Sequence, residues 1–524
     1  MIARRSLLAT AGATLALPAA AQPARVMKFV PQTDLTTLDP IWTISNVARN
    51  HGYMVWDTLY GTDAQYRIRP QMAEGHTEED DGRRVTVTLR AGLKFHDGEA
   101  VRAQDAVASI KRWARRSPTG QVLLTYLEEI SAADDRRIVF RLKRRFPQLI
   151  GALGLPSSPV CFIMPERLAN TDPFQPVREA VGSGPFKFMH AEHRSGSFAA
   201  WERYAGYSPT PDNARGLTAG PKVVHFDRVE WHTIPDAATA SAALMSGEID
   251  WFEQMPPEVS TLLERQRQLV VDVMDTLVFP CSMRMNHLHP PFDNPAIRRA
   301  LLGAINQEDF MTAIVGPTPA RFETGVGFFT PGTPLANEEA LGPLKGPRSI
   351  EASKRALREA GYKGEPIRLL GTTDIISTSA MAQVAIDFFR KLEVNLDIAL
   401  SDWGALVQRR NNRGPVAQGG WSVSCFANSG MDFVNPGTHN SLRSDGNAAT
   451  PGWPSIPALE ALRMQFFDAP EVSQQQAIAR DIQRVAMQEL PYIPLGGYRS
   501  LTAHKRNLAD RIKGFAIFWG IHRA

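Results

Sequence analysis

The chain has 524 residues, of which 43% are hydrophobic and 21% are charged. This length exceeds what one hydrophobic core supports, so we expect at least two domains in a globular protein. The formal net charge of +4 becomes +2 once Arg4 and Arg5, near the N-terminus, are left out. So small an excess of positive charge argues against nucleic acid or a membrane surface as the partner.

The first residues have the pattern of a secretory leader. Arg4 and Arg5 precede an apolar stretch over residues 7–17, and alanines occupy positions 19–21. This order of positive, apolar and small residues is typical of a signal peptide, and the apolar run is too short to span a bilayer. We therefore predict a signal peptide over residues 1–21, cleaved after Ala21, and an exported, periplasmic protein that begins at Gln22.

Two export routes fit this leader. The paired arginines, followed by Leu7 and Leu8, indicate the twin-arginine route. Ala3 stands where that route usually has a serine, which keeps the general secretory route open. No cysteine lies at the cleavage point, so we expect no lipid anchor there.

Strand and helix patterns alternate through the rest of the chain. Alternating apolar residues predict strands over 85–89 and 138–142, and helical spacing predicts a helix over 103–113. Further helices are predicted over 237–246, 294–305, 349–361 and about 379–391, with strands near 367–370 and 394–400. This succession indicates mixed α/β layers. Segments rich in proline and glycine, over 208–221, 325–347 and 435–457, are predicted to be surface loops.

Five short stretches carry the most specific signals. They are Leu38-Asp39-Pro40 with 56–60; 73–107, which includes Phe95-His96-Asp97-Gly98; 182–188; Leu244 with 247–250; and Asn286 with 291–294 and 298–301. Together, and in this order, they resemble the extracellular solute-binding proteins of family 5, which serve peptide, nickel and related importers. The stretch over 73–107 is the most specific match, and the five span nearly all of the chain after the leader.

The resemblance implies an α/β fold of the periplasmic binding protein type II, with an extra subdomain and two lobes joined by a two-strand hinge. We predict lobe I from residues 22–278 and 495–524, with a subdomain inserted at about 62–182. Lobe II is predicted from residues 279–494. The hinge strands are expected near 275–284 and 492–497. A solute that contacts both lobes would then drive their closure.

The sequence gives only weak signals for catalytic or metal-binding groups. His96 and Asp97 pair an imidazole with a carboxylate, but adjacent residues on an extended segment point to opposite faces, and Gly98 favours a turn. His287 and His289 have a spacing that suits a metal, yet no third ligand is close in sequence. No zinc-protease helix, nucleophile elbow or phosphate-binding loop occurs. We therefore predict no enzyme activity, no cofactor and no metal site.

The chain has three cysteines, Cys161, Cys281 and Cys425. Their spacing matches neither a metal site nor a redox motif. A single disulfide among them and three buried thiols are both compatible with the sequence.

The resemblance also directs attention to a Gly-Trp pair. In peptide-binding relatives such a pair is followed closely by an aspartate that neutralises the amino terminus of the peptide. Here Gly420-Trp421 matches the pair, and Ser424 takes the place of the aspartate. Burying an ammonium without a counter-charge costs several kcal/mol, so Ser424 argues against a free peptide amine. Asp432 either supplies this charge instead or caps the turn before Asn435-Pro436.

Three further candidates each have an alternative interpretation. Trp421 offers a broad apolar face and one donor, so we predict that it packs against the ligand, with burial in the core as the alternative. Trp403 either borders the cleft or seats a helix. Arg443 either pairs with a ligand carboxylate or is solvated.

The segment after the Leu38-Asp39-Pro40 turn supplies the remaining candidates. Trp42, Ser45 and Asn46 lie in a stretch that often borders the cleft in relatives of the family. We therefore predict that these three residues contact the ligand from lobe I.

The expected function is that of a monomeric, periplasmic substrate-binding component of an ABC importer. It would capture a peptide or a related small organic solute and deliver it to permease subunits in the inner membrane. The alternatives are a secreted hydrolase, which would need a nucleophile or metal group, and a periplasmic chaperone or sensory module on the same scaffold. A nickel carrier is a variant of the leading hypothesis, and the sequence leaves the solute open between a peptide, a nickel chelate and an organic acid or amine.

Overall fold

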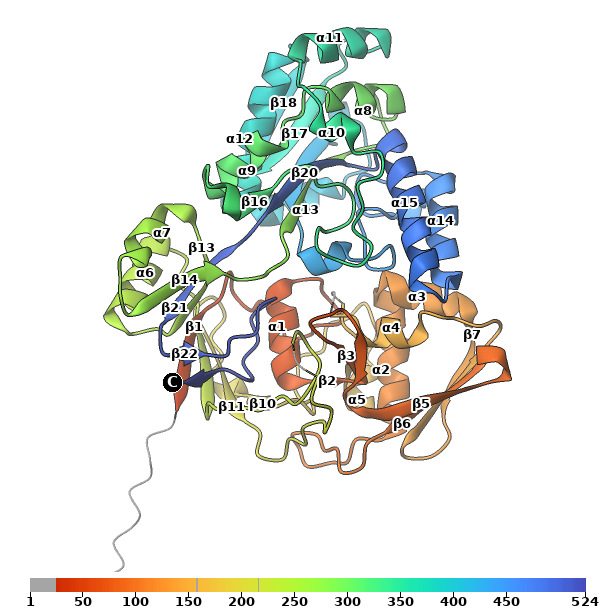
Figure 1. Cartoon of the computed structure of the whole chain (residues 1–524), viewed down its shortest axis with the longest axis vertical. Coiled ribbons are helices and arrows are strands. Elements are labelled where there is room, and N and C mark those ends of the chain that lie inside the picture. Colours follow the sequence, from red (N-terminus) through yellow and green to blue (C-terminus); the bar gives the residue numbers. More distant parts are fainter. Residues whose placement is uncertain (1–24, 157–158, 215) are drawn as a thin grey trace, which may run out of the picture.

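The computed structural model describes residues 25–156, 159–214 and 216–524, so the predicted leader lies outside the described residues. Two mixed sheets and a smaller antiparallel sheet organise the fold (Figure 1). The predicted mixed α/β class is confirmed. In this part of the chain, no helix combines the length and apolarity that crossing a membrane requires.

The seven-stranded sheet is built from both ends of the described chain. Its order is β10 (Phe186–Phe188), β11 (Phe198–Arg203), β12 (Arg228–His232), β1 (Val26–Val30), β13 (Trp251–Met255), β21 (Leu501–Lys505) and β14 (Leu269–Val273). β1 runs parallel to β12 and β13, and β21 lies antiparallel to β13 and β14. The helices α6 (Ala237–Ser246) and α7 (Pro257–Glu264) pack against its β13, β21 and β14 strands. We call the part around this sheet lobe I; it also includes α1 (Asn46–Val55), β22 (Leu508–Ala509) and β23 (His522–Arg523).

The six-stranded sheet draws its strands from a single stretch of the chain. Its order is β16 (Phe322–Glu323), β20 (Ile493–Tyr498), β15 (Phe279–Met285), β19 (Val423–Ala427), β17 (Ile367–Thr372) and β18 (Leu396–Ser401). Its helices are α8 (Pro295–Leu302), α9 (Gln307–Val315), α10 (Gly342–Lys345), α11 (Ile350–Glu359), α12 (Ile376–Lys391), α13 (Trp403–Arg410), α14 (Pro457–Asp468) and α15 (Val472–Glu489). This part, lobe II, lies above lobe I in Figure 1.

A subdomain is inserted in lobe I between α1 and β10. Its four-stranded antiparallel sheet has the order β5 (Ala73–Glu79), β6 (Arg84–Leu89), β8 (Arg137–Leu142) and β7 (Leu127–Ala132). It also contains α2 (Ala103–Arg116), α3 (Pro118–Tyr126), α4 (Leu149–Gly154), α5 (Glu166–Ala169) and the strand pairs β2 (Asp57–Thr58) with β9 (Phe162–Ile163) and β3 (Tyr60–Thr62) with β4 (Ile68–Pro70). In Figure 1 the strand β7 and the helix α3 lie beneath α14 of lobe II.

The chain passes between the two large sheets at two places. The predicted boundary at 278/279 falls in the segment that joins β14 to β15. The predicted boundary at 494/495 falls inside β20, whose Tyr498 still pairs with Phe279 of β15. Because β21 is the next strand of lobe I, we propose that the second crossing lies at residues 499–500 and that this pair of segments forms the hinge.

Two predicted helices differ from those in the structure. The helix predicted over 294–305 ends at Leu302, because Asn306 caps a new helix, α9, with its side chain accepting a hydrogen bond from Glu308 N at 3.2 Å. The helix predicted from about 379 begins at Ile376. Its first turn is held by the Thr378 hydroxyl, which bonds to Ile375 O, a contact that apolar periodicity does not reveal.

Gly182 and Gly184 allow a close backbone approach, and the chain bends at residues 183–185 just before β10. A Cβ atom on Gly182 would lie 2.1 Å from the carbonyl oxygen of Val55, at the end of α1. His96 joins the same contact: its Nε2 lies 3.0 Å from Gly184 O, and its Nδ1 accepts from Gly182 N at 3.4 Å. Burial lowers the pKa of His96 to about 4. The histidine is therefore neutral and ties two of the sequence stretches together.

The other histidine and cysteine candidates also have structural positions. His287 is largely buried, and His289 Nε2 lies 2.7 Å from the backbone oxygen of Arg413. Cys161, Cys281 and Cys425 are buried free thiols, so the alternative of a disulfide is not found.

Asp39 fixes the segment that leads into α1. Its carboxylate accepts bonds from Arg112 of α2, with Nη2 at 2.6 Å and Nη1 at 3.2 Å, and both side chains are almost fully buried. The same carboxylate accepts hydrogen bonds from the backbone N–H groups of Ile41, Trp42 and Val177. This buried ion pair therefore fixes the backbone at residues 41 and 42, just before the segment that leads into α1.

Candidate ligand-binding site

A cavity of about 560 Å³ lies between lobe I and lobe II. Lobe I contributes Gln32, Thr33, Thr43, Ile44, Ser45, Asn46 and Gln254; lobe II contributes Phe279, Ser282, Arg284, Ile375, Ser377, Thr378, Trp403, Val407, Arg410, Phe426, Ala427, Asn428, Ser429, Asp432, Phe433, Asn440, Ser441, Thr450, Pro451 and Tyr498. A neighbouring cavity of about 400 Å³ shares Gln32, Trp403 and Tyr498 with it. The volume lies within the range of roughly 300–1,000 Å³ that is usual for small-molecule sites.

Another cavity is larger, at about 740 Å³. Its wall comes mostly from lobe I and the first crossing segment, including Asp275, Arg511 and Trp519, and lobe II adds Met431. We choose the 560 Å³ cavity as the candidate site because each lobe forms a substantial part of its wall, and a ligand there would contact both.

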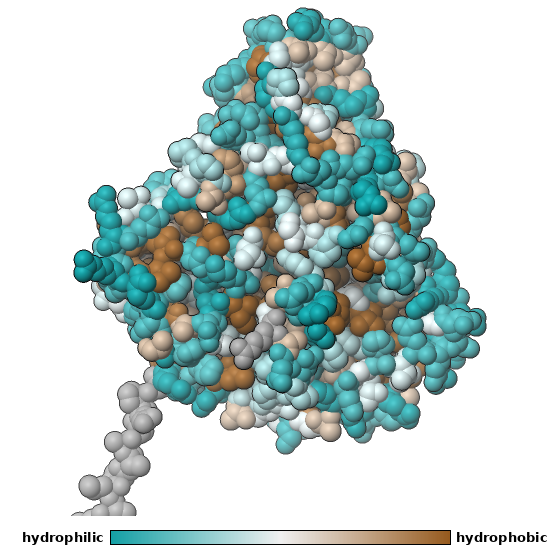
Figure 2. Space-filling view, in the orientation of Figure 1, coloured by the Kyte–Doolittle hydropathy of each residue, from teal (hydrophilic) through white to brown (hydrophobic). Residues whose placement is uncertain are grey.

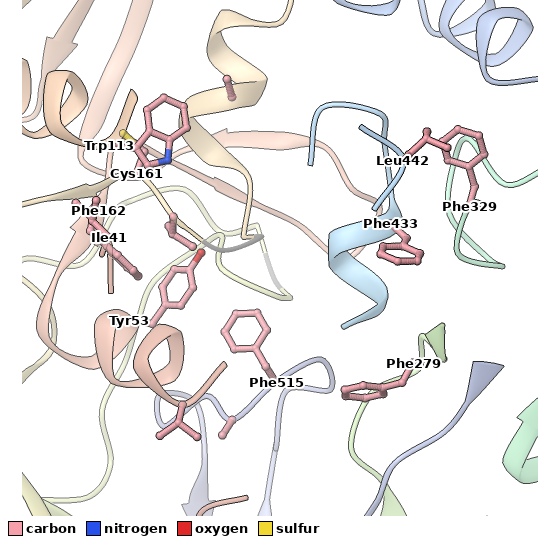
Figure 3. Packing of buried hydrophobic residues seen from close by; sticks show 14 of the residues in the cluster. Ile41, Tyr53, Trp113, Cys161, Phe162, Phe279, Phe329, Phe433, Leu442 and Phe515 are labelled. Atoms are coloured by element: carbon pink, nitrogen blue, oxygen red, sulfur yellow. The ribbon is translucent and has the colours of Figure 1, made fainter. Parts of the chain in front are cut away.

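Aromatic side chains from both lobes surround the region where the lobes meet. Tyr53 of α1 stacks on Phe515 with ring centroids 5.3 Å apart, and Phe433 stacks on His439 at 3.6 Å. Figure 3 shows Tyr53 and Phe515 facing each other on one side, with Phe433 and Phe279 of lobe II opposite. On the outer face, Figure 2 shows mostly hydrophilic residues, with hydrophobic ones gathered across the middle. The aromatic pairs Tyr53–Phe515 and Phe433–His439 therefore give the region where the lobes meet an apolar, well-packed interior.

Lobe I presents a neutral polar wall. Ser45 is the N-cap residue of α1, yet its side chain makes no capping hydrogen bond, and Asn46 begins the helix. Gln32 follows β1, and its backbone N–H donates to Glu253 Oε2 at 2.7 Å. Asn50 Nδ2 donates to the other carboxylate oxygen of Glu253 at 3.1 Å. The buried Glu253 thus positions Gln32 at the cavity.

Glu253 predicts a pH dependence of stability. Burial raises its pKa from 4.5 to about 7. The native state therefore holds a proton that the unfolded chain has lost, so the free energy of unfolding falls as pH rises from about 4.5 to 7, by roughly 3 kcal/mol from this group. Glu253→Gln should flatten this part of the profile in denaturant titrations between pH 5 and 8. The exposed Glu258→Gln is the control, and equal slopes in both variants would contradict the assignment.

Lobe II presents the aromatic and cationic wall. Asp402 caps α13 by accepting from Ala405 N at 3.0 Å, and this helix carries Trp403 and Arg410 to the cavity. The Trp403 side chain is 36% exposed, and its ring lies edge-on to Phe426 at 6.1 Å. The indole is therefore available to a ligand on its open face.

Two guanidinium groups line the lobe II side of the cavity. Arg284 of β15 is 3% exposed, and burial, together with the nearby charge of Arg410, lowers its pKa to about 9. Burial also lowers the pKa of Arg410. Both shifts show that positive charge is held here in poorly solvated surroundings.

Asp432 lies on the lobe II wall near a cation of lobe I. Arg49 of α1 is buried, and its guanidinium lies 4.3 Å from the ring centroid of Phe515. Burial lowers the pKa of Arg49, and the charge of Asp432 is the largest of those that oppose this shift. Asp432 and Arg49 therefore attract each other across the two lobes.

Four of the eight predicted ligand residues line the cavity. These are Ser45, Asn46, Trp403 and Asp432. Trp42 does not: its Nε1 donates to Phe174 O at 3.1 Å. Arg443 also lies elsewhere, because its guanidinium bonds to Asp445 and to Gln121 of the subdomain.

The structure places Trp421 and Ser424 behind the cavity wall. Trp421 is 1% exposed, donates from Nε1 to Arg410 O at 2.8 Å, and packs in a cluster with Phe426 and Trp453. Trp421 therefore lies in the hydrophobic core, as the alternative interpretation of this residue expects. Ser424 is fully buried, and its hydroxyl donates to Leu370 O at 2.9 Å.

Sequence reasoning missed several cavity residues. Arg284 and Arg410 are the most informative, because they carry charge. A signal for Arg284 exists: it is the sole charged residue in the otherwise apolar or small run of β15. Gln32 and Asn428 follow the ends of strands, where no residue pattern distinguishes them from ordinary loop positions, and Gln254 lies inside β13.

The chain matches the family described as bacterial extracellular solute-binding proteins, family 5 Middle, over residues 67–442. It is 34% identical to the probable peptide ABC transporter periplasmic-binding protein y4tO of Sinorhizobium fredii, over 94% of this chain and 92% of that protein. It is 24% identical to the glutathione-binding protein GsiB of Escherichia coli K12, over 96% and 95% of the two chains. Among solved structures, the periplasmic binding protein DppA of Helicobacter pylori with the peptide STSA matches with a TM-score of 0.79 and 21% identity, over 95% of this chain and 98% of that one.

Proposed function

Because the chain belongs to family 5 of the bacterial extracellular solute-binding proteins, we propose that it captures a peptide or a related small organic solute in the cavity between lobes I and II. The family and the relatives are substrate-binding proteins of ABC transporters, not enzymes, and the fold is of the periplasmic binding protein type II. The captured solute would then pass to the permease subunits of an importer.

The observation that carries this proposal is a cavity walled by both lobes. The lobes also contact each other outside the cavity. Tyr126 Oη donates to Asp468 Oδ1 at 2.7 Å, and Gln148 Nε2 donates to Ala469 O at 2.9 Å. These bonds join the subdomain to the end of α14. A solute in the cavity that contacts both lobes would favour this arrangement of the lobes.

The relatives favour a peptide-like solute. The names of the relatives refer to a peptide and to glutathione, and the H. pylori structure holds a peptide. We extend this to the present chain as a peptide or a chemically related solute. We further propose a monomer that is exported with cleavage after Ala21, and we favour the twin-arginine route because of the Arg4-Arg5 pair.

Ser45→Trp tests the proposed cavity. Ser45 makes no capping bond, so the substitution should cost α1 little, while the indole would fill the space that a solute needs. We expect purified wild-type protein to retain or bind a small solute, seen by native mass spectrometry and as a rise in the melting temperature, and Ser45→Trp to lose both. Thr36→Trp, at an exposed position outside the cavity, is the control. Unchanged capture by Ser45→Trp would place the solute elsewhere.

A further inference from the structure

Two arginines at the cavity form no ion pair with a carboxylate of the described residues. Arg284 and Arg410 both line it. Within the described part of the chain, neither forms an ion pair with an aspartate or glutamate, and no aspartate or glutamate is among the charges that shift their pKa values. The residues outside that part include no aspartate or glutamate. Asp432, the acidic residue on the same wall, acts on Arg49 instead.

Arg284 is fixed and supplies charge. Its Nε donates to Pro451 O at 3.0 Å, its Nη1 to Ser441 O at 2.5 Å, and its Nη2 to the hydroxyl of Thr450 at 2.6 Å. All of these acceptors are neutral, so the bonds hold the guanidinium in place without cancelling its charge. Its position at the cavity wall therefore leaves a fixed positive potential inside.

Of these two arginines, Arg410 has a guanidinium N–H donor that makes no hydrogen bond within the described residues. It lies at the C-terminal end of α13, and its guanidinium lies 4.8 Å from the ring centroid of Phe426. Its Nε is buried and has no hydrogen-bond partner among the described residues. The guanidinium fork matches a carboxylate with two parallel hydrogen bonds, and a buried donor left without a partner is costly.

We propose, on the basis of the function proposed above, that the cavity selects anionic solutes and that Arg410 binds a carboxylate of the solute, with Arg284 behind it as a fixed charge. Burying two neighbouring cations is unfavourable unless an anion accompanies them. The bound solute supplies that anion, so binding and charge neutralisation occur together. Arg410 is thus the contact residue and Arg284 the positioning and electrostatic residue of this subsite.

A positively charged group of a solute would meet one carboxylate on the cavity wall, that of Asp432, which Arg49 already attracts. Ser424, where peptide-binding relatives place an aspartate, is neutral, buried and bonded to Leu370 O. Asp432 is attracted to Arg49. A free ammonium group would therefore meet two guanidinium groups without a dedicated counter-charge, and we infer that the preferred solute has a net negative charge.

A charge-resolved capture experiment tests this subsite. Protein freed of ligand by unfolding and refolding is incubated with the small-molecule fraction of a cell extract, and captured compounds are identified by mass spectrometry. Affinities are then measured for the captured compound and for its carboxamide analogue. We expect an anionic compound, about 10- to 100-fold weaker binding of the amide, and a similar loss in Arg410→Gln, in line with the strength of charge-assisted hydrogen bonds. Arg409→Gln, exposed on the same helix, should bind normally.

The outcomes separate this inference from the proposed function. Capture of a neutral or cationic compound, or equal affinity of wild type and Arg410→Gln for the captured anion, would overturn the anionic subsite and leave the carrier function standing. Capture of no compound of any charge would overturn both. Arg410→Lys, which keeps the charge but loses the fork, should bind more weakly than wild type and more tightly than Arg410→Gln.

Discussion

Asp39→Asn should lower the free energy of unfolding by about 3–5 kcal/mol, because it removes one partner of a buried ion pair and leaves the charge of Arg112 uncompensated. The Arg112 side chain is 1% exposed and the Asp39 side chain is 0% exposed, so water cannot replace the lost carboxylate. Denaturant titration followed by tryptophan fluorescence would measure the loss.

A substitution in an exposed ion pair is the control for Asp39→Asn. Asp387 and Lys391 form an ion pair on α12 at 2.6 Å with both side chains exposed, and Asp387→Asn should change stability little. Since Asp39 also holds the backbone of Ile41 and Trp42, next to the cavity residues 43–46, the folded fraction of Asp39→Asn should bind its solute more weakly. A loss of stability no larger than that of Asp387→Asn would contradict the role given to the Asp39–Arg112 pair.

Trp421→Ala should also cost about 3–5 kcal/mol of stability, because it empties a large volume in the core of lobe II. The indole is buried among Leu406, Phe426 and Trp453 and donates one hydrogen bond to Arg410 O. The removed side chain leaves a space that its rigid neighbours cannot fill.

Trp403→Ala is the counterpart of Trp421→Ala. Trp403 lines the cavity and is partly exposed, so its removal should weaken solute binding and cost much less stability. Thermal unfolding and binding titrations on both variants separate the two roles. If Trp421→Ala stayed stable while losing affinity, Trp421 would be a ligand contact as the sequence first suggested.

Local periodicity was enough to predict much of the fold. The alternation over 85–89 and 138–142 became β6 and β8, and the apolar stripe beginning at Ala103 became α2. These segments are regular because each buries one face against its neighbours. Helix ends were less predictable, since the end of α8 depends on the cap that Asn306 provides to the following helix.

The predicted residues that line the cavity lie mostly at the start of an element that faces the other lobe, and Asp432, inside the turn Gly430–Phe433, is the exception. Ser45 and Asn46 begin α1, and Trp403 begins α13, so their place follows from the fold. Trp421 does not line the cavity, because it packs against Trp453, a residue distant in sequence. Arg410 was missed because an arginine at a helix end is usually solvated, and only the packing of Phe426 against it reveals otherwise.

A crystal structure of the protein with the solute that it captures would test the central claim most directly. We predict that the solute lies between Asn46 of lobe I and Trp403 of lobe II, with both lobes in contact with it and a carboxylate at Arg410. A solute found instead in the cavity beside Asp275 and Arg511, or bound to one lobe alone, would contradict the account.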